Sequence, residues 1–302
     1  MKTARAHYDG RAMPDQPDHA PQPGTLHVVA TPIGNLGDLS PRAQQVLGEV
    51  AAVCAEDTRH TRRLLAHFGI EADLVALHEH NEQQQAARLV QRLQAGESLA
   101  LVSDAGTPLV SDPGFRLVRA AREAGVRVSP VPGPSALVAA LSVAGVPSDR
   151  FAFEGFLPAK GGARRERLQR LAGEPRTLIF YEASHRIAET LDDMAEAFGP
   201  DRHAVMAREL TKLFETVLDG RLADLRDRVR EDADQRKGEF VLVVEGAAED
   251  AGAVLAEGHR VCAVLSRHLP PSTAARLAAE ITGAPRKALY GAGSGEGGGA
   301  GL

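Results

Sequence analysis

The stretch LALVSDAGTPLVSDPGFRLVRAAREA, residues 99–124, contains the pattern that decides the fold. Its first four residues are apolar, and a loop rich in Gly, Pro and Asp follows from Ser103 to Gly114. An amphipathic segment of helical length then runs over 115–124. An apolar run, a Gly/Pro-rich loop and an amphipathic stretch, in that order, predict a strand, a turn and a helix.

The same alternation extends over residues 26–146. The segments expected to be strands are 26–30, 52–55, 74–77, 99–102 and 126–131. The segments expected to be helices are 41–50, 58–68, 82–95, 115–124 and 135–144. Strands that alternate with helices predict a mostly parallel sheet that is covered on both faces.

A second α/β pattern follows the turn at 147–150, which we take as a domain boundary. Its expected strands are 151–156, 177–181, 204–208, 215–218 and 240–244, and its expected helices are 163–171 and 185–198. From 251 onward the strand patterns stop, and two short helical segments near 253–265 and 273–282 carry an excess of Arg and Lys. The predicted division is a disordered extension, an α/β domain, a second α/β domain, a helical module and a disordered Gly-rich tail, over 1–24, 25–147, 148–250, 251–290 and 291–302.

The composition is that of an ordinary globular protein. Of the 302 residues, 43% are hydrophobic and 25% are charged, and the length suffices for two domains that each bury a core. Aromatic residues make up only 4% and Trp is absent, so the cores must be aliphatic. The formal net charge of −5 does not by itself indicate a nucleic-acid partner, although a local basic patch is compatible with it.

Cysteine usage and hydropathy indicate a cytoplasmic protein. Cys54 and Cys262 are far apart and form no CxxC pair, which excludes a zinc ribbon or a redox dithiol. A disulfide framework is not expected either, which fits a reducing compartment. No apolar run is long enough to span a membrane, and the polar segment 1–24 lacks the apolar core of a signal peptide.

Three Gly/Pro-rich loops, 31–35, 103–114 and 131–135, each follow a predicted strand. The carboxyl ends of parallel strands meet at one edge of a sheet, so the loops should converge there. Asp104 and Asp112 can hydrogen-bond a ribose or a charged amine. Backbone N–H groups in the second loop, and the start of the helix after the third, favour an anionic group. One such loop would be a tight connection; three in register, with two aspartates, indicate a ligand site.

Several other kinds of site are excluded. The chain has no GxGxxG dinucleotide fingerprint, no Gly-Lys dipeptide of a Walker A loop and no GxSxG nucleophile elbow. It also lacks a cluster of metal ligands, because the HxH pair at His78 and His80 is more typical of a solvated loop. No metal is therefore expected.

Two basic segments allow two interpretations each. In 55–63, Asp57 is a natural N-cap, and Arg59, Arg62 and Arg63 fall on one helix face that could contact phosphates or simply be solvated. The second segment is a basic run over 160–170, which could likewise contact an RNA backbone or form an ordinary solvated helix. Its candidates for RNA contact are Lys160, Arg164 and Arg165. Glu209, Lys212 and Glu215 surround a strand end, either as site residues or as surface charges.

A set of motifs, in this order and with similar gaps over about 25–290, resembles the ribosomal RNA small-subunit methyltransferase I family. The segments that carry the resemblance are 26–36, 55–63, 103–108 with 111–114, 131–136, 180–186, 208–212 and 237–240. The family belongs to the tetrapyrrole-methylase-like superfamily. The resemblance implies two α/β domains with S-adenosylmethionine in the cleft between them, a homodimer, and 2′-O-methylation of a cytidine ribose in the decoding region of small-subunit rRNA, free or in the 30S subunit. It also implies that the C-terminal helices are an RNA-contacting module.

Carried over residue by residue, the resemblance assigns the cleft to loops of both domains. The residues expected to bind the cofactor are Pro32, Asp104, Ala105, Gly106, Thr107, Asp112, Pro132, Ser135, Ala136, Tyr181, Ala183 and Leu210. A ribose hydroxyl is a poor acid, so a base or a polarising group should assist as its proton leaves. The candidates for that role are Glu56, Asp57, Glu182, Glu209 and Lys212.

Three other functions remain open at this point. A relative in the same superfamily methylates tetrapyrroles, although a small macrocycle would not need the basic C-terminal helices. A dinucleotide oxidoreductase would share the sheet but not the missing fingerprint. A non-catalytic RNA-binding protein would explain the basic segments and leave the three loops without a role.

Overall fold

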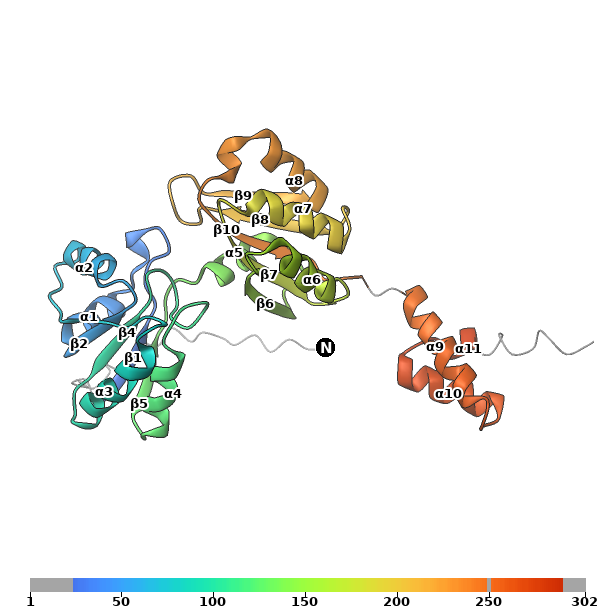
Figure 1. Ribbon diagram of the computed structural model, residues 1–302, viewed down its shortest axis with the longest axis horizontal. Coiled ribbons are helices and arrows are strands. Elements are labelled where there is room, and N and C mark those ends of the chain that lie inside the picture. The colour runs from blue at the N-terminus through green and yellow to red at the C-terminus, as the bar shows by residue number, and fades with distance from the viewer. Residues whose placement is uncertain (1–23, 249–250, 290–302) are drawn as a thin grey trace, which may run out of the picture.

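The computed structural model describes residues 24–248 and 251–289, which form two α/β domains and a group of C-terminal helices (Figure 1). The segments predicted to be disordered, 1–24 and 291–302, lie outside the described residues except for Gly24. None of the helices within the described ranges is long and apolar enough to cross a membrane.

The first domain contains a parallel sheet of five strands in the order β3-β2-β4-β1-β5. The strands are β1 (Thr25–Val29), β2 (Ala52–Ala55), β3 (Leu74–Ala76), β4 (Leu99–Val102) and β5 (Arg127–Val131). The helices are α1 (Pro41–Glu49), α2 (Thr58–His67), α3 (Glu82–Gln94), α4 (Phe115–Glu123) and α5 (Ala136–Ala144), with the 3-10 turn η1 (Leu36–Asp38) before α1. The predicted α/β fold with a parallel sheet is confirmed.

Alternation along the central strand explains why both faces of this sheet are covered. In β4, Leu99 and Leu101 pack with Leu117 of α4, whereas Ala100 and Val102 pack on the opposite face with Leu47 of α1. Helices α3 and α4 therefore cover one face, and α1 and α2 cover the other. Both faces of β4 are fully buried, as expected for a central parallel strand.

The second domain contains a mixed sheet in the order β6-β7-β10-β8-β9. Its strands are β6 (Phe151–Phe156), β7 (Thr177–Ala183), β8 (His203–Arg208), β9 (Thr216–Arg221) and β10 (Glu239–Val244), and only the β6–β7 pairing is parallel. Its helices are α6 (Gly161–Leu171), α7 (Ile187–Phe198) and α8 (Leu222–Glu231), followed by the 3-10 turn η2 (Ala233–Arg236). Helix α8 is absent from the helices predicted above.

Helix α5 packs on the second sheet although it directly follows the last strand of the first. Its buried Ala140 and Ala144 lie in one apolar cluster with Ile179, Val205 and Val241 of the second sheet. Helices α6, α7 and α8 cover the other face of that sheet. The boundary predicted at 147/148 thus falls after α5, whereas the packing of α5 joins it to the second sheet, because the sequence ALVAALSVA offers apolar side chains and no charge.

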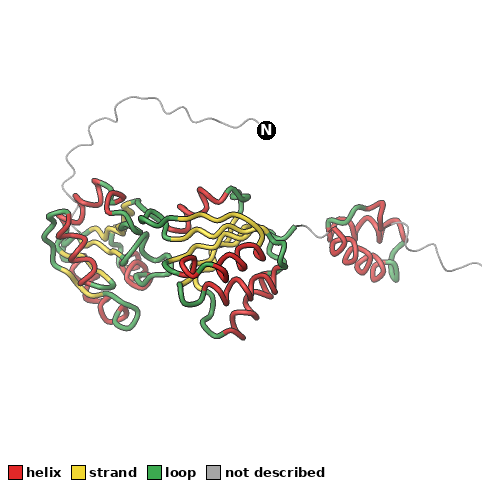
Figure 2. The backbone as a smooth tube through the Cα atoms, turned by 90° about the horizontal axis from the view of Figure 1, so that it is seen from above, coloured by secondary structure: helices red, strands yellow, loops and turns green. Residues whose placement is uncertain are grey.

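The C-terminal helices lie apart from both domains in the two perpendicular views (Figures 1 and 2). They are α9 (Ala251–Leu265), α10 (Pro271–Thr282) and α11 (Arg286–Leu289). Ala275, Ala278, Ala284 and Leu289 are buried among them and form a small core of their own. This arrangement agrees with the helical module predicted for the end of the chain.

Candidate active site

The three Gly/Pro-rich loops are hydrogen-bonded to one another. The Thr31 N–H donates to the Gly106 carbonyl at 2.9 Å, and the Gly106 N–H donates back to the Thr31 carbonyl at 3.0 Å. The Thr107 hydroxyl donates to the Pro134 carbonyl at 3.0 Å. The loops therefore form one continuous wall at the carboxyl edge of the first sheet, where a parallel sheet is expected to bind its ligand.

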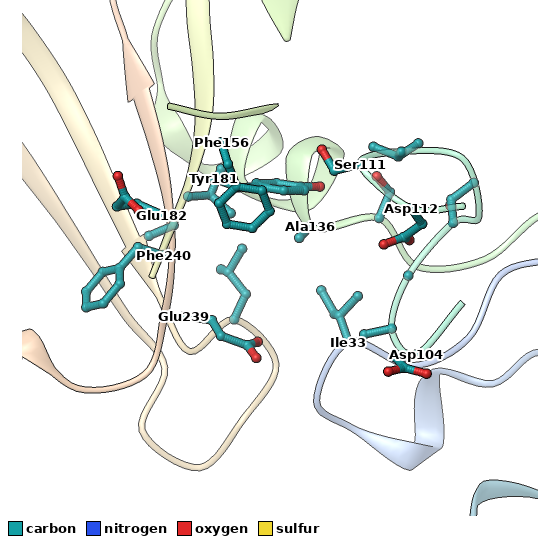
Figure 3. Close-up of a pocket in the computed structure, with 18 of the residues that line it drawn as sticks. Ile33, Asp104, Ser111, Asp112, Ala136, Phe156, Tyr181, Glu182, Glu239 and Phe240 are labelled. Atoms are coloured by element: carbon teal, nitrogen blue, oxygen red, sulfur yellow. The ribbon is translucent and has the colours of Figure 1, made fainter. Parts of the chain in front are cut away.

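A pocket of about 380 Å³ separates this wall from the second sheet. Figure 3 shows Ile33, Asp104 and Asp112 on one side of it, and Glu239 and Phe240 on the other. The side chains of Ala207, Leu210 and Val241 add to its apolar surface, and the N-terminal end of α5 closes it at Ser135 and Ala136. A pocket of this size, mostly apolar with a few convergent polar groups, is typical of a small-molecule site.

Backbone strain is concentrated in the second loop. Leu109 and Ser111 have φ angles of 73° and 66°, which side chains other than Gly rarely adopt. Each such residue costs ~1–3 kcal/mol and persists only where its surroundings impose it. Gly106, with a φ of 81°, lies where an added Cβ would come within 3.4 Å of Ile33. The loop is thus held in a fixed, costly shape beside the pocket, as is common at binding sites.

Three carboxylates lie on the first-domain side of the pocket, and two of them, Asp104 and Asp112, line it. The Asp104 carboxylate accepts a hydrogen bond from the Asp57 N–H at 3.0 Å, which connects the second loop to the start of α2. Burial raises the pKa of Asp112 to about 6; the hydrogen bond with Ser103 opposes this shift, and the negative charges of Glu56 and Asp104 add to it. Burial likewise raises the pKa of Glu56, again with a contribution from Asp104. These carboxylates repel one another, so a ligand with hydroxyl donors or a positive charge would relieve the repulsion.

Tyr181 connects the second domain to the start of α5. Its hydroxyl accepts a hydrogen bond from the Leu137 N–H at 3.1 Å, and its ring makes edge contacts with Phe153 and Phe156 at centroid distances of 4.8 and 5.6 Å. Burial raises the pKa of the Tyr181 hydroxyl, which keeps it protonated. One of the N–H groups in the first turn of α5 is therefore satisfied by protein rather than left for an anionic ligand.

A lysine between two carboxylates lies on the wall of the pocket. The Lys212 Nζ donates to Glu209 Oε1 at 2.8 Å and to Glu239 Oε2 at 3.0 Å. Although burial opposes it, these hydrogen bonds and charges raise the pKa of Lys212 and lower that of Glu209. Glu209 and Thr211 both have positive φ angles, 52° and 65°, so the backbone around the lysine is also held in a strained conformation.

Comparison with known proteins identifies the family. Residues 25–226 match the family described as Tetrapyrrole (Corrin/Porphyrin) Methylases, and residues 252–294 match the RsmI C-terminal HTH domain. The protein named Ribosomal RNA small subunit methyltransferase I from Xylella fastidiosa (strain Temecula1) is 72% identical over 89% of this chain and 98% of its own. The protein of the same name from Pseudomonas aeruginosa is 60% identical over 88% of this chain and 95% of its own. The chain belongs to the ribosomal RNA small subunit methyltransferase I family.

Solved structures agree on the fold of the two domains of this methyltransferase I family member. The methyltransferase CobJ aligns with a TM-score of 0.55 at 20% identity, over 74% of this chain and 95% of CobJ. Diphthine synthase aligns with a TM-score of 0.53 at 17% identity, over 73% of this chain and 89% of its own. Members of the family use S-adenosylmethionine as the methyl donor, so the cofactor predicted from the sequence is confirmed.

Most residues that the sequence assigns to the methyltransferase cofactor lie around the pocket. Those that line it are Asp104, Ala105, Gly106, Thr107, Asp112, Ser135, Ala136, Tyr181, Ala183 and Leu210. Pro32 instead lines an adjoining groove. Pro132 is exposed and lines neither hollow, because it precedes the turn that leads into α5.

The five catalytic candidates have different surroundings. Lys212 lines the pocket and Glu209 is its ion-pair partner, as described above. Asp57 caps α2 by accepting from the Arg59 N–H at 2.8 Å, and Glu56, which lies directly before it, does not line the pocket. Glu182 also lines the pocket (Figure 3), but it is only 2% exposed and its carboxylate is already engaged, accepting from Thr190 at 2.7 Å and from Arg186. Lys212 is therefore the candidate best placed to meet a substrate.

The basic residues also divide. Arg164 is 2% exposed and forms ion pairs with Asp193 at 2.6 Å and Glu189 at 3.1 Å, so it cannot contact RNA as the sequence predicted. Its position on the buried face of α6, with Leu168 and Leu171, explains this correction. Lys160 and Arg165 of the same run are exposed.

The basic residues of α2 do not form one surface. Arg59 is exposed and pairs with Asp57 at 3.4 Å. Arg63 lines the groove that contains Pro32, whereas Arg62 lines a separate cavity at the end of α2. The single face predicted for the three arginines is therefore divided between two surfaces.

Sequence reasoning missed several pocket residues. Glu239 belongs to a segment that supports the family resemblance, yet it was given no role of its own. Ile33, Phe156, Phe240 and Val241 line the pocket but are ordinary apolar residues of loops and strands. Only the packing of the two sheets places them together, and no spacing in the chain signals it.

Proposed function

We propose that this protein transfers a methyl group from S-adenosylmethionine to the 2′-hydroxyl of a cytidine in the decoding region of small-subunit rRNA. The observation that carries the proposal is the charged Lys212 at the wall of the cofactor pocket, held by two carboxylates. An ammonium has three N–H donors. Two of these are directed to Glu209 and Glu239, which leaves the third for a substrate oxygen.

The residues of the pocket fit the cofactor. Asp104 and Asp112 can accept hydrogen bonds from ribose hydroxyls or an ammonium, and the apolar surface of Ile33, Leu210 and Val241 suits an adenine ring. When bound, S-adenosylmethionine would supply a methyl group that the positive charge on its sulfur activates for transfer, and the residues of the pocket would hold that group for the ribose oxygen. Holding two reactants in line in this way can supply ~7–11 kcal/mol of barrier lowering.

Lys212 and Glu239 divide the proton chemistry. Because the Lys212 pKa is raised, Lys212 stays protonated. Its ammonium donates a hydrogen bond to the ribose oxygen as negative charge develops on that oxygen. The Glu239 carboxylate is 78% exposed, so it can accept the proton that leaves the hydroxyl and pass it to solvent. Glu209 acts through Lys212 and fixes its position.

The names of the relatives support rRNA as the substrate, and the match of residues 252–294 to an HTH domain supports a nucleic-acid contact by the C-terminal helices. We propose phosphate contacts from Arg59, Arg63, Lys160 and Arg165, together with the basic residues of α9, α10 and α11. The resemblance also supports a cytoplasmic homodimer.

The decisive experiment supplies S-adenosylmethionine with a labelled methyl group to the purified protein, together with 30S subunits, naked 16S rRNA or a tetrapyrrole. The expected product is rRNA that carries the label at one cytidine and resists alkaline cleavage on its 3′ side, because a 2′-O-methyl group removes the internal nucleophile. Label on a base, label only in the tetrapyrrole, or no label in any substrate would refute the proposal.

A further inference from the structure

A groove of about 650 Å³ adjoins the cofactor pocket on the side of α2. The two hollows share the lining residues Ile33, Asp104, Ala105, Lys212 and Glu239. A molecule in the groove would therefore reach the pocket at the position of Lys212. Apart from Pro32, none of the residues expected to bind the cofactor lies in the rest of this groove.

One wall of the groove is a continuous face of α2. His60, Arg63, Leu64 and His67 all line it, at the i, i+3, i+4 and i+7 spacing that places side chains on one side of a helix. Leu64 is buried, whereas the other three are exposed. The wall thus presents an apolar base with a rim of one guanidinium and two imidazoles, all of which can donate hydrogen bonds to an anion.

The first Gly/Pro-rich loop and the turn that follows it form another part of the groove's lining. Pro32, Gly34 and Leu36 line the groove there. Gly34 lies against the loop that carries Lys212. A Cβ added at Gly34 would come within 3.0 Å of Thr211 Oγ1 and would collide with the Lys212 side chain. The absence of a side chain at Gly34 therefore lets the first loop approach the lysine closely.

Charge is distributed unevenly along the groove. The end shared with the cofactor pocket carries the two carboxylates of Asp104 and Glu239 against the single ammonium of Lys212, whereas the α2 wall carries Arg63, His60 and His67 and no carboxylate. A phosphate is repelled from the first end and attracted to the second. A ligand with a phosphate and a hydroxyl several ångströms apart would thus have a defined orientation, with its hydroxyl toward Lys212.

We propose that this groove binds the target nucleotide of the RNA, with its ribose at the pocket and an adjoining phosphate against Arg63, His60 and His67. This inference rests on the proposed function, because it places the hydroxyl that is methylated. The apolar surface of Leu36, Leu64 and Pro32 suits a base or ribose that has left its stack. RNA targets are commonly recognised with the base unstacked, and phosphate contacts fix the register.

Arg62 provides a matched control for Arg63. The two residues are adjacent, both exposed and both on α2. Arg62 lines a separate hollow with Ala66, Gly69 and Ile70, on another side of the helix. Replacing either arginine by Gln removes the same charge from the same helix, so a difference between the two variants reports the groove.

The test measures the affinity of 5′-CMP, 3′-CMP and cytidine for the protein saturated with S-adenosylhomocysteine. Changes in the NMR signals of the histidine side chains during the titration report binding. In the wild type, at least one monophosphate should bind about tenfold more tightly than cytidine, as expected for one charge-assisted contact. Arg63→Gln should abolish that preference, and Arg62→Gln should retain it. Affinity for S-adenosylhomocysteine should be the same in all three proteins.

Two results would overturn the groove assignment: the same phosphate preference in Arg63→Gln as in the wild type, or equal losses in Arg62→Gln and Arg63→Gln. Because this binding measurement needs no methyl transfer, it is separate from the labelling experiment above. A protein that binds the monophosphate through Arg63 but does not label rRNA would refute the proposed reaction and keep the groove. A protein that labels rRNA but shows no difference in phosphate preference between Arg62→Gln and Arg63→Gln would keep the proposed reaction and refute the groove assignment.

Discussion

Replacing Asp112 by Asn should stabilise the protein against unfolding at neutral pH and weaken cofactor binding. Burial is the main cause of the raised Asp112 pKa of about 6, compared with a usual value of 3.8. A folded-state pKa above the unfolded one means that ionisation destabilises the fold. The cost of the ionised carboxylate is absent below pH 4, grows as the pH rises to about 6, and is constant above that.

The size of the effect follows from the shift. At ~1.4 kcal/mol per pKa unit, a shift of about two units corresponds to roughly 3 kcal/mol. The carboxyl is only partly buried and water screens part of this cost, so we expect a gain of about 1–2 kcal/mol in the free energy of unfolding of Asp112→Asn above pH 6. Below pH 4 the variant should be no more stable than the wild type.

Urea denaturation at a series of pH values between 3.5 and 8 measures this difference, with Asp38→Asn as the control. Asp38 is exposed in η1, so its replacement changes the charge without relieving any burial. Calorimetry should show weaker binding of S-adenosylmethionine to Asp112→Asn at pH 7.5. A stability difference that does not change with pH, or one that grows toward low pH, would refute the reasoning.

Three further changes test other parts of the site. Lys212→Met should lower kcat for rRNA methylation ~100–1,000-fold while leaving cofactor affinity nearly unchanged, and Lys212→Arg should recover part of the loss; an equal loss in both variants would count against a charged donor. Tyr181→Phe should cost ~1–3 kcal/mol in urea unfolding, because the N–H in the first turn of α5 loses its acceptor; an unchanged midpoint would contradict that role. Arg164→Ala should destabilise the fold by ~3–5 kcal/mol, since the buried Asp193 then loses its 2.6 Å partner and keeps only the 3.5 Å contact with the half-exposed Arg165. Arg165→Ala should cost much less, because the short Arg164–Asp193 pair remains; unfolding midpoints compare the two, and equal losses would contradict the assignment.

The first domain was largely predictable from the sequence because its strands and helices alternate strictly. β2 and β4 have the predicted bounds, β1 is shifted by one residue at both ends, and the other strands and helices of this domain differ by one residue at one end. β1, β2, β4 and β5 each end in a loop with Gly, Pro or Asp, so chemistry and local structure change at the same residue there. The same loops supplied most of the polar residues of the pocket.

The second domain was less predictable, since a strand pattern does not give the direction of its neighbour. The segments at β8 and β9 were recognised as strands, yet their antiparallel pairing and the helix α8 after them were not. Arg164 was assigned to the surface as part of a basic run, although its spacing from Leu168 places it on the buried face of α6. Residues such as Glu239 and Phe156 approach the pocket only when the two sheets come together.

The position of α5 has a consequence for how the chain can be divided. The helix starts at the wall of the cofactor pocket, is held there by Tyr181, and buries its apolar face on the second sheet. A fragment that ends at the 147/148 boundary would carry α5 with that face exposed to water, and a fragment that begins there would lack the cover of its sheet. A ligand bound in the pocket contacts both parts, so it favours the joined state over the separated one. We therefore expect the two domains to be exchangeable between relatives only as one unit. Chimaeras should tolerate a crossover before β1 or after β10, but not at the 147/148 boundary.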